Sequence, residues 1–269
     1  VGDNSLRYTW EGGKSFQKTA GENKARSFLG LPGKQLDLVK SIYEKNKNLT
    51  VVYVSGKPIS EPWIEDNIKS IIHAWEPGSM GGKSLGKIVF GEINPSGKMP
   101  MTTARSVGQL TMVYNHKPTN YIHKYAFEKT KPLYRFGFGL SYTTFSISKP
   151  TLSTSKWDGT GKVIVEVDVK NTGEREGMET IQLYIRDLFS SVTRPVLELK
   201  GYKKVNVAPG ETKRVTFSLA IDDFAFYDRE MKFKAEKGDF NILVGNAANL
   251  AKLKTTTLEL TKNIYINEN

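Results

Sequence analysis

Three carboxylates near the N-terminus could do acid–base chemistry: Asp3, Glu11 and Glu22. They stand in a polar stretch rich in Gly, Lys and Ser, which also carries Tyr8 and Trp10. Sugars bind aromatic faces through their apolar C–H surfaces, and hydrolysis of a glycosidic bond needs an acid that protonates the leaving oxygen. A glutamate can supply this proton near neutral pH when burial by substrate raises its pKa. These residue types favour a carbohydrate site and leave all three carboxylates open as the acid.

Glu22 stands among small residues, Ala20, Gly21 and Ala25, which let the backbone present one carboxyl group without crowding it. A helical pattern takes over from Lys34, and catalytic groups usually sit on loops held by such rigid elements. A single loop glutamate is nevertheless more often a solvated carboxylate with no catalytic role. Features elsewhere in the chain are therefore needed to decide whether Glu22 is catalytic.

Helices and strands alternate after this loop. Apolar spacing predicts helices over residues 34–46, 62–68 and 81–90, and strands over 49–54 and 70–75. Both strands are apolar along their length, which is typical of a parallel sheet with helices on both sides. Ligand sites in such sheets lie at the carboxyl ends of the strands. We expect the carboxylate-bearing loop to belong to that edge, because the residues before it look like the tail of another strand.

A period of two replaces this pattern from about residue 146. Four valines, from Val163 to Val169, alternate with Ile164, Glu166 and Asp168. Further strands are predicted near residues 181–185, 196–207, 212–220, 231–236 and 239–245. Short, closely spaced strands indicate an antiparallel sandwich of immunoglobulin or fibronectin III type. The tail after about residue 261 is expected to fray.

Composition excludes several other classes of protein. There is no cysteine, which removes disulfides, zinc–thiolate clusters and thiol catalysis. Lys plus Arg number 39 against 28 Asp plus Glu, but the basic residues are spread along the chain and no standard nucleic-acid recognition motif is present. No apolar run approaches the roughly 20 residues that cross a bilayer. We expect neither a nucleic-acid nor a membrane partner.

Motifs for nucleotides and metals are weak. Residues 77–84 follow a strand and end in Gly-Lys-Ser, as a phosphate-binding loop does, but Pro77 opens the pattern and donates no N–H to a phosphate nest. Gly137-Phe138-Gly139 lacks the third glycine and the helix of a dinucleotide fingerprint. The histidines lack metal-ligand spacing, and His73 reads as a satisfied core histidine. We expect no cofactor and no metal.

A series of short motifs runs in order along nearly the whole chain. In the first part these are Val1-Gly-Asp-Asn4, Gly21-Glu22 with Ala25-Arg26-Ser27, Leu31-Pro-Gly-Lys-Gln35, Ser55-Gly-Lys-Pro58, Ala74-Trp-Glu-Pro-Gly78, residues 90–100, Arg105-Ser-Val-Gly-Gln109, Tyr114-Asn-His-Lys117 and residues 136–145. In the second part they are Val169-Lys-Asn-Thr-Gly173, Ile181-Gln-Leu-Tyr-Ile185, Arg194-Pro195, Leu199-Lys-Gly-Tyr202, Phe226-Tyr-Asp228 and Val244-Gly245. With these motifs the chain resembles the C-terminal half of glycoside hydrolase family 3, the β-glucosidase type.

The resemblance implies a division of catalytic labour. In this family a (β/α)8 barrel supplies an Asp nucleophile, and the α/β sandwich domain that follows supplies the acid/base, commonly a Glu just before an Arg-Ser or Arg-Thr pair. Glu22 matches that position, because Arg26 and Ser27 follow it. Glu11 is the reserve, since the length of this loop varies in the family. Trp10 and Arg26 are the expected substrate-binding residues.

The resemblance also implies what lies outside this chain. The barrel and the first strands and helices of the α/β domain are expected to be missing. Residues 1–118 would then form the C-terminal part of a truncated α/β sandwich, 119–145 a connecting loop, and 146–269 a fibronectin III-like β-sandwich. We expect the chain alone to be inactive, and an open sheet edge to favour a homodimer.

For the whole enzyme the resemblance implies a retaining β-glucosidase without a cofactor, secreted or periplasmic. Its substrate would be a β-glucoside or an oligosaccharide with a terminal non-reducing β-D-glucosyl residue. A β-xylosidase is an alternative, because the pocket that recognises this sugar lies mostly in the barrel. A non-catalytic carbohydrate-binding or adhesion module is another. The β part lacks an obvious exposed aromatic row, although Tyr184, Tyr202 and Tyr227 cannot be placed from sequence.

Overall fold

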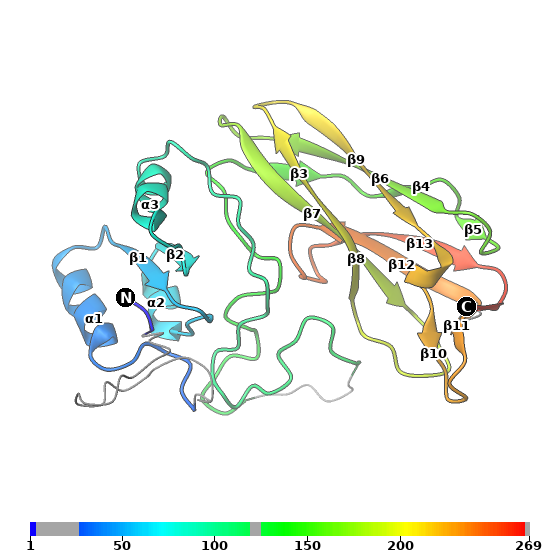
Figure 1. Cartoon of the computed structure of the whole chain (residues 1–269), viewed down its shortest axis with the longest axis horizontal. Helices are drawn as coiled ribbons and strands as arrows, with labels where there is room; N and C mark the ends of the chain where they lie inside the picture. The colour runs from blue at the N-terminus through cyan, green and yellow to red at the C-terminus, as the bar shows by residue number, and fades with distance from the viewer. Residues whose placement is uncertain (4–26, 119–124, 267–269) are drawn as a thin grey trace. The chain divides into compact units, whose positions relative to one another are not determined.

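The computed structural model describes residues 1–3, 27–118 and 125–266, and these form two compact units (Figure 1). Unit 1 takes its described residues from 1–93, 103–112 and 123–134, and unit 2 from 94–102, 113–122 and 135–269. The stretch between residues 94 and 134 thus contributes to both units in turn. The domain boundaries at residues 118 and 146 stay a prediction.

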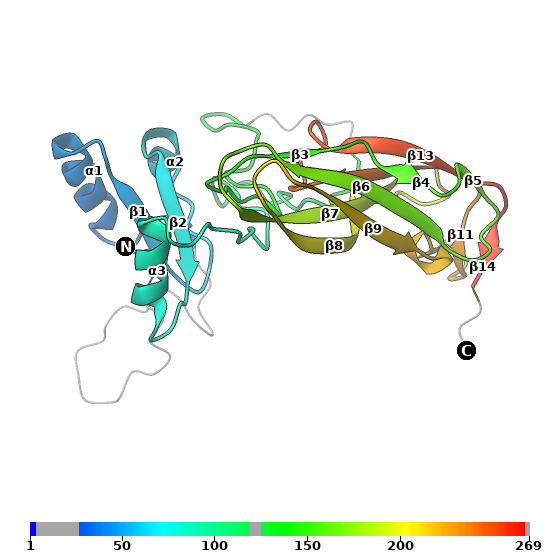
Figure 2. The same ribbon diagram turned by 90° about the horizontal axis from the view of Figure 1, so that it is seen from above.

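Unit 1 contains the five predicted helices and strands. They are α1 (Gln35–Lys45), β1 (Thr50–Val54), α2 (Pro62–Asn67), β2 (Ser70–Trp75) and α3 (Gly81–Val89). Local chemistry explains the ends of the helices: Pro62 opens α2, where its missing N–H costs nothing, and Lys45 lies in the last turn of α1, where the helix dipole favours a cation. Strand β1 pairs with β2 in parallel, as expected (Figure 2).

The core of unit 1 lies on one face of this sheet. Val51 and Tyr53 of β1 are buried and share a cluster with Val39 of α1 and Ile64 of α2. Side chains of a strand alternate between its faces, so Val52 points to the opposite side, where it is only partly buried. The apolar residues of the strands are therefore covered more completely on the α1–α2 side.

Unit 2 is a β-sandwich. One sheet has the order β5-β13-β12-β7-β8, and the other has the order β3-β6-β4, with β9 pairing with β6. The strands are β3 (Phe145–Ile147), β4 (Thr151–Leu152), β5 (Lys156–Trp157), β6 (Val163–Asn171), β7 (Gly177–Asp187), β8 (Glu198–Val207), β9 (Thr212–Leu219), β12 (Gly238–Gly245) and β13 (Lys254–Leu260). A turn of 3-10 helix, η1 (Ile221–Asp223), precedes a small sheet of β10 (Phe226–Tyr227), β11 (Phe233–Ala235) and β14 (Ile264–Tyr265).

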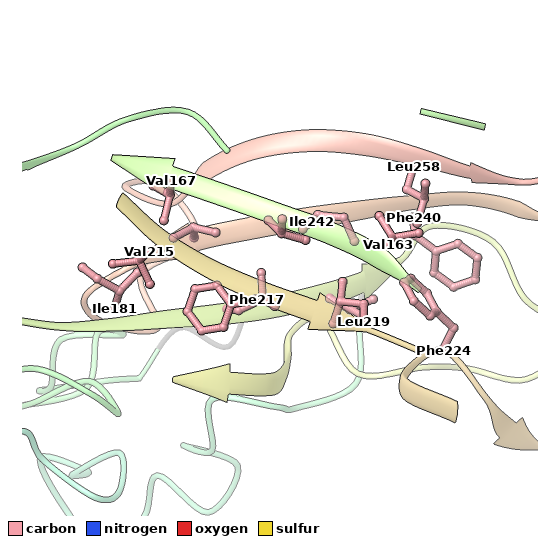
Figure 3. Packing of buried hydrophobic residues seen from close by; sticks show 14 of the residues in the cluster. Val163, Val167, Ile181, Val215, Phe217, Leu219, Phe224, Phe240, Ile242 and Leu258 are labelled. Atoms are coloured by element: carbon pink, nitrogen blue, oxygen red, sulfur yellow. The ribbon is translucent and has the colours of Figure 1, made fainter. Parts of the chain in front are cut away.

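The inner faces of the two large sheets share one core (Figure 3). Val163 and Val167 of β6 and Phe217 of β9 project from one sheet, and Ile181 of β7 and Ile242 of β12 from the other. Every second residue of β6 is buried up to Asn171, which is the alternation that the valines predict. The fibronectin III-like architecture is confirmed.

One expectation for the C-terminal region is wrong, and one strand was missed. Strand β13 was not predicted, since its first four residues, Lys254 to Thr257, show no alternation of apolar and polar residues and only Leu258 and Leu260 are buried. The tail was expected to fray after about residue 261, yet β14 pairs with β11 through Lys234↔Tyr265 and Ala235↔Ile264. This pairing partner lies some thirty residues earlier in the chain, so the local pattern carries little sign of it.

Candidate active-site edge

The predicted site residues Glu22, Glu11, Trp10 and Arg26 lie outside the described residues, so their roles stay predictions. What the structure does describe is the two flanks of residues 4–26. The first flank is residues 1–3 and the second is residues 27–33. The hydrogen bonds of these two flanks are described first.

The first flank runs along the edge of β1. The Val54 N–H donates to the Val1 carbonyl oxygen at 3.0 Å, and the Asp3 N–H donates to the Val54 carbonyl oxygen at 3.2 Å. The Ser55 hydroxyl donates to Asp3 Oδ2 at 2.9 Å. A Cβ at Gly2 would overlap the Val54 carbonyl oxygen, so only glycine permits this approach. Asp3 is thereby placed at the carboxyl end of β1.

The second flank is held by the residues that precede α2. The Ser60 N–H donates to the Leu29 carbonyl oxygen at 2.9 Å, and the Leu31 N–H donates to Glu61 Oε1 at 2.6 Å. Glu61 is buried, and burial raises its pKa, against the opposing effects of the Leu31 N–H and Lys40. Because Ser60 and Glu61 follow β1 in the chain, both flanks lie at the carboxyl side of the sheet. The position of the carboxylate-bearing loop itself lies outside the described residues and stays a prediction.

Strand β2 ends at the same edge in a strained conformation. Trp75 has a φ of 55°, and the register of the β1–β2 pair shifts between Tyr53 and Val54. The Ser55 N–H donates to the Trp75 carbonyl oxygen at 3.0 Å, so the chain after β1 is tied to this residue. Non-glycine residues rarely adopt positive φ, and such residues cluster at functional sites. Sequence reasoning did not select Trp75 as a site residue, although its place directly before Glu-Pro-Gly was a signal.

An aromatic cluster lies beside this edge. The ring of His73 is centred 5.0 Å from the rings of both Tyr53 and Tyr134. The Tyr134 hydroxyl donates to Glu65 Oε2 at 2.5 Å. Within the described ranges His73 Nε2 is buried without a hydrogen-bond partner, while the residue as a whole is partly buried, so the expected satisfied core histidine is not what the structure shows. Burial lowers the pKa of His73 from 6.5 to about 4, so the imidazole is neutral at physiological pH.

The partly buried imidazole of His73 should make unit 1 acid-sensitive. Its folded-state pKa lies below the unfolded value, so the unfolded chain takes up the extra proton. The free energy of unfolding should therefore fall as the pH drops from about 6.5 to about 4, by roughly 3 kcal/mol in total. Urea unfolding near pH 4.5 and near pH 7 measures this change in the free energy of unfolding. Hydrogen exchange of amides in β1 and β2 serves as the probe, so that only unit 1 is observed. His73→Leu should remove most of the difference; an unchanged difference in this variant would exclude His73 as its source.

Arg105 is buried and contacts Ser60, which precedes α2, and Glu128. Arg105 Nε donates to Glu128 Oε1 at 2.7 Å, and the Ser60 hydroxyl is 3.1 Å from the Arg105 carbonyl oxygen. Next to Glu128, Phe127 has a φ of 68° and is fully exposed. An exposed aromatic ring on a strained turn is the type of group that sugars contact, and sequence reasoning did not single it out.

In residues 1–3, 27–118 and 125–266 no group of three or more His, Asp or Glu side chains is placed to hold a metal ion. In the same ranges no helix is both long and apolar enough to cross a membrane.

Comparison with known proteins identifies the family. Residues 9–142 match the family model described as the glycosyl hydrolase family 3 C-terminal domain, and residues 179–248 match the fibronectin type III-like domain. The chain belongs to glycoside hydrolase family 3. It corresponds to the C-terminal part of that family, as the motifs predicted.

Two similar family 3 proteins are each about three times as long as the part that they share with this chain. A periplasmic beta-glucosidase of Salmonella typhimurium is 38% identical over 254 residues, which is 91% of this chain and 33% of that protein. A beta-xylosidase of Formosa agariphila is 39% identical over 248 residues, 91% of this chain and 34% of its own length. The chain thus spans about one third of these family 3 proteins.

Solved structures agree on the fold. The b-glucosidase EmGH1 of Erythrobacter marinus superposes with a TM-score of 0.84 at 37% identity, covering 91% of this chain and 32% of that one. A beta-glucosidase from Listeria innocua, solved in complex with glucose, gives 0.82 at 29% identity, with 87% and 34% covered. The predicted fold class, an α/β part followed by a fibronectin III-like β-sandwich, is confirmed.

Proposed function

We propose that this chain is the C-terminal part of a retaining β-glycosidase that hydrolyses terminal non-reducing β-D-glucosyl residues. Within it, Glu22 is the acid/base, and the Asp nucleophile lies in an N-terminal barrel outside these residues. One observation carries the proposal: in a family 3 domain, the described residues on either side of the segment with Glu22, Asp3 and Leu31, are both anchored to residues at the carboxyl side of β1. Its substrate is a β-glucoside or an oligosaccharide, and it needs no cofactor.

The proposed reaction has two steps. In the first, the carboxyl group of Glu22 protonates the leaving oxygen while the barrel Asp forms a covalent bond to the sugar. In the second, the carboxylate of Glu22 takes a proton from the water that breaks this bond. Trp10 would stack on the apolar face of a sugar ring, and Arg26 would hold substrate hydroxyls. Glu11 is the reserve for the acid/base role.

The name of one relative supports a location for this protein, and the open sheet edge supports a partner. The Salmonella relative is named a periplasmic enzyme, which supports a secreted or periplasmic location for this protein. Strand β2 pairs with β1, and the described residues supply no second neighbour for it. This open edge supports our proposal that an N-terminal segment, or a second copy of the chain, completes the sheet. Sedimentation of the chain as a stable monomer would count against the second copy.

A β-xylosidase is the second candidate. Two Formosa agariphila relatives, 39% and 34% identical, are named a beta-xylosidase and a putative beta-xylosidase. The non-catalytic binding module has less support. Of the three tyrosines that a sugar-binding row in unit 2 could use, Tyr184 is fully buried, whereas Tyr202 and Tyr227 are exposed.

The chain alone should release no aglycone from aryl β-glucosides or aryl β-xylosides above the buffer rate, because the proposed nucleophile is absent. The whole enzyme should hydrolyse one of these substrates and give the β-anomer as its first product. Timed NMR spectra of the product distinguish the two anomers. Hydrolysis by the chain alone would place the nucleophile within these residues, and an α-anomeric first product would refute the retaining mechanism.

A further inference from the structure

Residues 125–128 form a tight turn of unit 1 that presents Phe127 to solvent. Tyr125 and Glu128 pair in an antiparallel bridge, and Phe127 between them has a φ of 68° and a fully exposed side chain. A positive φ is unfavourable for a bulky residue, because its Cβ crowds the following carbonyl oxygen, and glycine would avoid this strain. Since the ring is fully exposed, packing does not offset the strain.

Hydrogen bonds on the C-terminal side of Phe127 hold the turn in place. Glu128 Oε1 accepts from Arg105 Nε at 2.7 Å and from the Lys129 N–H at 2.6 Å. Gln109 Nε2 donates to the Lys129 carbonyl oxygen at 2.8 Å, and Gln109 Oε1 accepts from the Arg105 N–H at 2.7 Å. Arg105 and Gln109 are both buried, so the turn is attached to a fixed part of unit 1. A strained φ persists only where the surroundings determine it in this way.

This combination distinguishes Phe127 from other exposed apolar residues, which are common on protein surfaces and by themselves identify no site. Within the described ranges Phe90 and Phe189 are also exposed, but neither has a positive φ. In the same ranges Trp75 and Met231 share the positive φ, but Trp75 is partly buried and Met231 has no ring. Of the described residues, only Phe127 offers a flat, fully exposed ring on a fixed and strained backbone.

Polar groups and the carboxyl side of the sheet lie next to this turn. Lys129 Nζ donates to Asp66 Oδ1 at 2.9 Å, and both side chains are about half exposed. Arg105, which holds Glu128, also accepts the Ser60 hydroxyl at its carbonyl oxygen, at 3.1 Å. Ser60 follows β1, and ligands of such sheets bind at the carboxyl ends of the strands. The turn therefore joins an apolar platform to hydrogen-bonding groups on the side where substrate is expected.

We propose that this turn is a contact site for a sugar unit of a β-linked oligosaccharide, with the Phe127 ring on the C–H face of the sugar and Lys129 and Asp66 at its hydroxyls. This inference rests on the proposed function. Equatorial hydroxyls leave the C–H bonds of a glucosyl or xylosyl unit on two flat faces, which fit an aromatic ring. A ring on a fixed turn loses little conformational freedom on binding, so the strained support favours affinity.

The test is an NMR titration of the 269-residue protein with cellohexaose, laminarihexaose and xylohexaose. At least one hexasaccharide should shift the amide resonances of Phe127 and Lys129 in the parent. Phe127→Ala should weaken the binding of that sugar roughly tenfold, because the stacking surface is lost, whereas Phe127→Tyr keeps the ring and should stay within about twofold of the parent. The matched control, Phe189→Ala, removes an exposed ring from unit 2 and should leave the affinity unchanged.

Phe127→Gly separates binding from folding. Glycine adopts a φ of 68° without strain and the exposed ring has no packing to lose, so this variant should unfold at a temperature no lower than the parent while it loses as much affinity as Phe127→Ala. Met231→Gly relieves a similar strain in unit 2 and should leave the affinity unchanged. A clear drop in the unfolding temperature of Phe127→Gly would show that the ring supports the fold and would overturn the argument from strain.

Three other results would overturn the proposal. They are the absence of shifts with every hexasaccharide in the parent, an unchanged affinity in Phe127→Ala, and a change in sedimentation between these two proteins, which would assign the ring to a protein–protein contact. Failure of the proposed function is a separate result. If the whole parent enzyme hydrolyses neither glucosides nor xylosides, the glycosidase is refuted, even where the titration shows that Phe127 binds the sugar.

Discussion

Glu22→Gln in the whole enzyme should lower the hydrolysis of alkyl β-glucosides by roughly 10²–10⁴-fold, the range of general acid catalysis. Glutamine cannot donate a proton to a poor leaving group, so the first step fails. With dinitrophenyl β-glucoside the covalent intermediate should still form rapidly. Turnover should then stop at the second step, because no carboxylate remains to deprotonate water. We expect a burst of dinitrophenol release followed by slow steady-state turnover.

Adding azide to this experiment tests whether Glu22 acts as the general base of the second step. It is a nucleophile that needs no general base, so it should restore turnover of Glu22→Gln and give β-glucosyl azide. Glu11→Gln is the matched control and should leave both steps largely intact, because Glu11 lies farther along the chain from Arg26-Ser27. If azide rescues Glu11→Gln and not Glu22→Gln, the acid/base role must be assigned to Glu11 in place of Glu22.

The second large effect is expected at a buried ion pair in unit 2. Arg194 is buried, with Nη2 at 2.6 Å from Glu198 Oε1 and Nη1 at 3.8 Å from Asp187 Oδ2. Its guanidinium also stacks on Phe226, 4.4 Å from the ring centre. The Asp187 side chain is only 3% exposed. Burial raises the pKa of Asp187 to about 6, because this effect is larger than the lowering by the Arg194 charge.

Arg194→Ala should lower the free energy of unfolding of unit 2 by about 3–5 kcal/mol, because it leaves a buried carboxylate without its counter-charge. Urea unfolding of the β-sandwich measures this. The loss should be larger above pH 6 than near pH 5, since Asp187 is then charged; a group with a raised folded-state pKa becomes more costly as the pH rises through it.

Arg214 supplies the control for this prediction. It also binds an aspartate, with Nε at 2.9 Å from Asp168 Oδ1, but its side chain is 61% exposed. Arg214→Ala should therefore cost much less than Arg194→Ala, since water solvates the carboxylate that is left. Equal losses in the two variants would show that burial of the Arg194 network contributes nothing.

The sequence by itself determined the family, the two types of fold and most of the secondary structure. The period of two from Val163 to Val169 specified β6, because a strand buried on one face must alternate. The apolar spacing after Lys34 specified α1 to within one residue at each end. Glu22 was selected by its position before Arg26-Ser27, a local motif, and this assignment stays a prediction.

Tertiary structure alone decided which distant residues meet. The pairing of Gly2 with Val54 and the hydrogen bonds between Gln35 and Gly2 join residues that no local period relates, and only the packed sandwich buries Arg194 with Asp187. Strand β14 formed for the same reason, because its partner β11 is distant in sequence. Backbone groups must find hydrogen-bond partners once the core has packed, and only the packed chain determines which partners lie within reach.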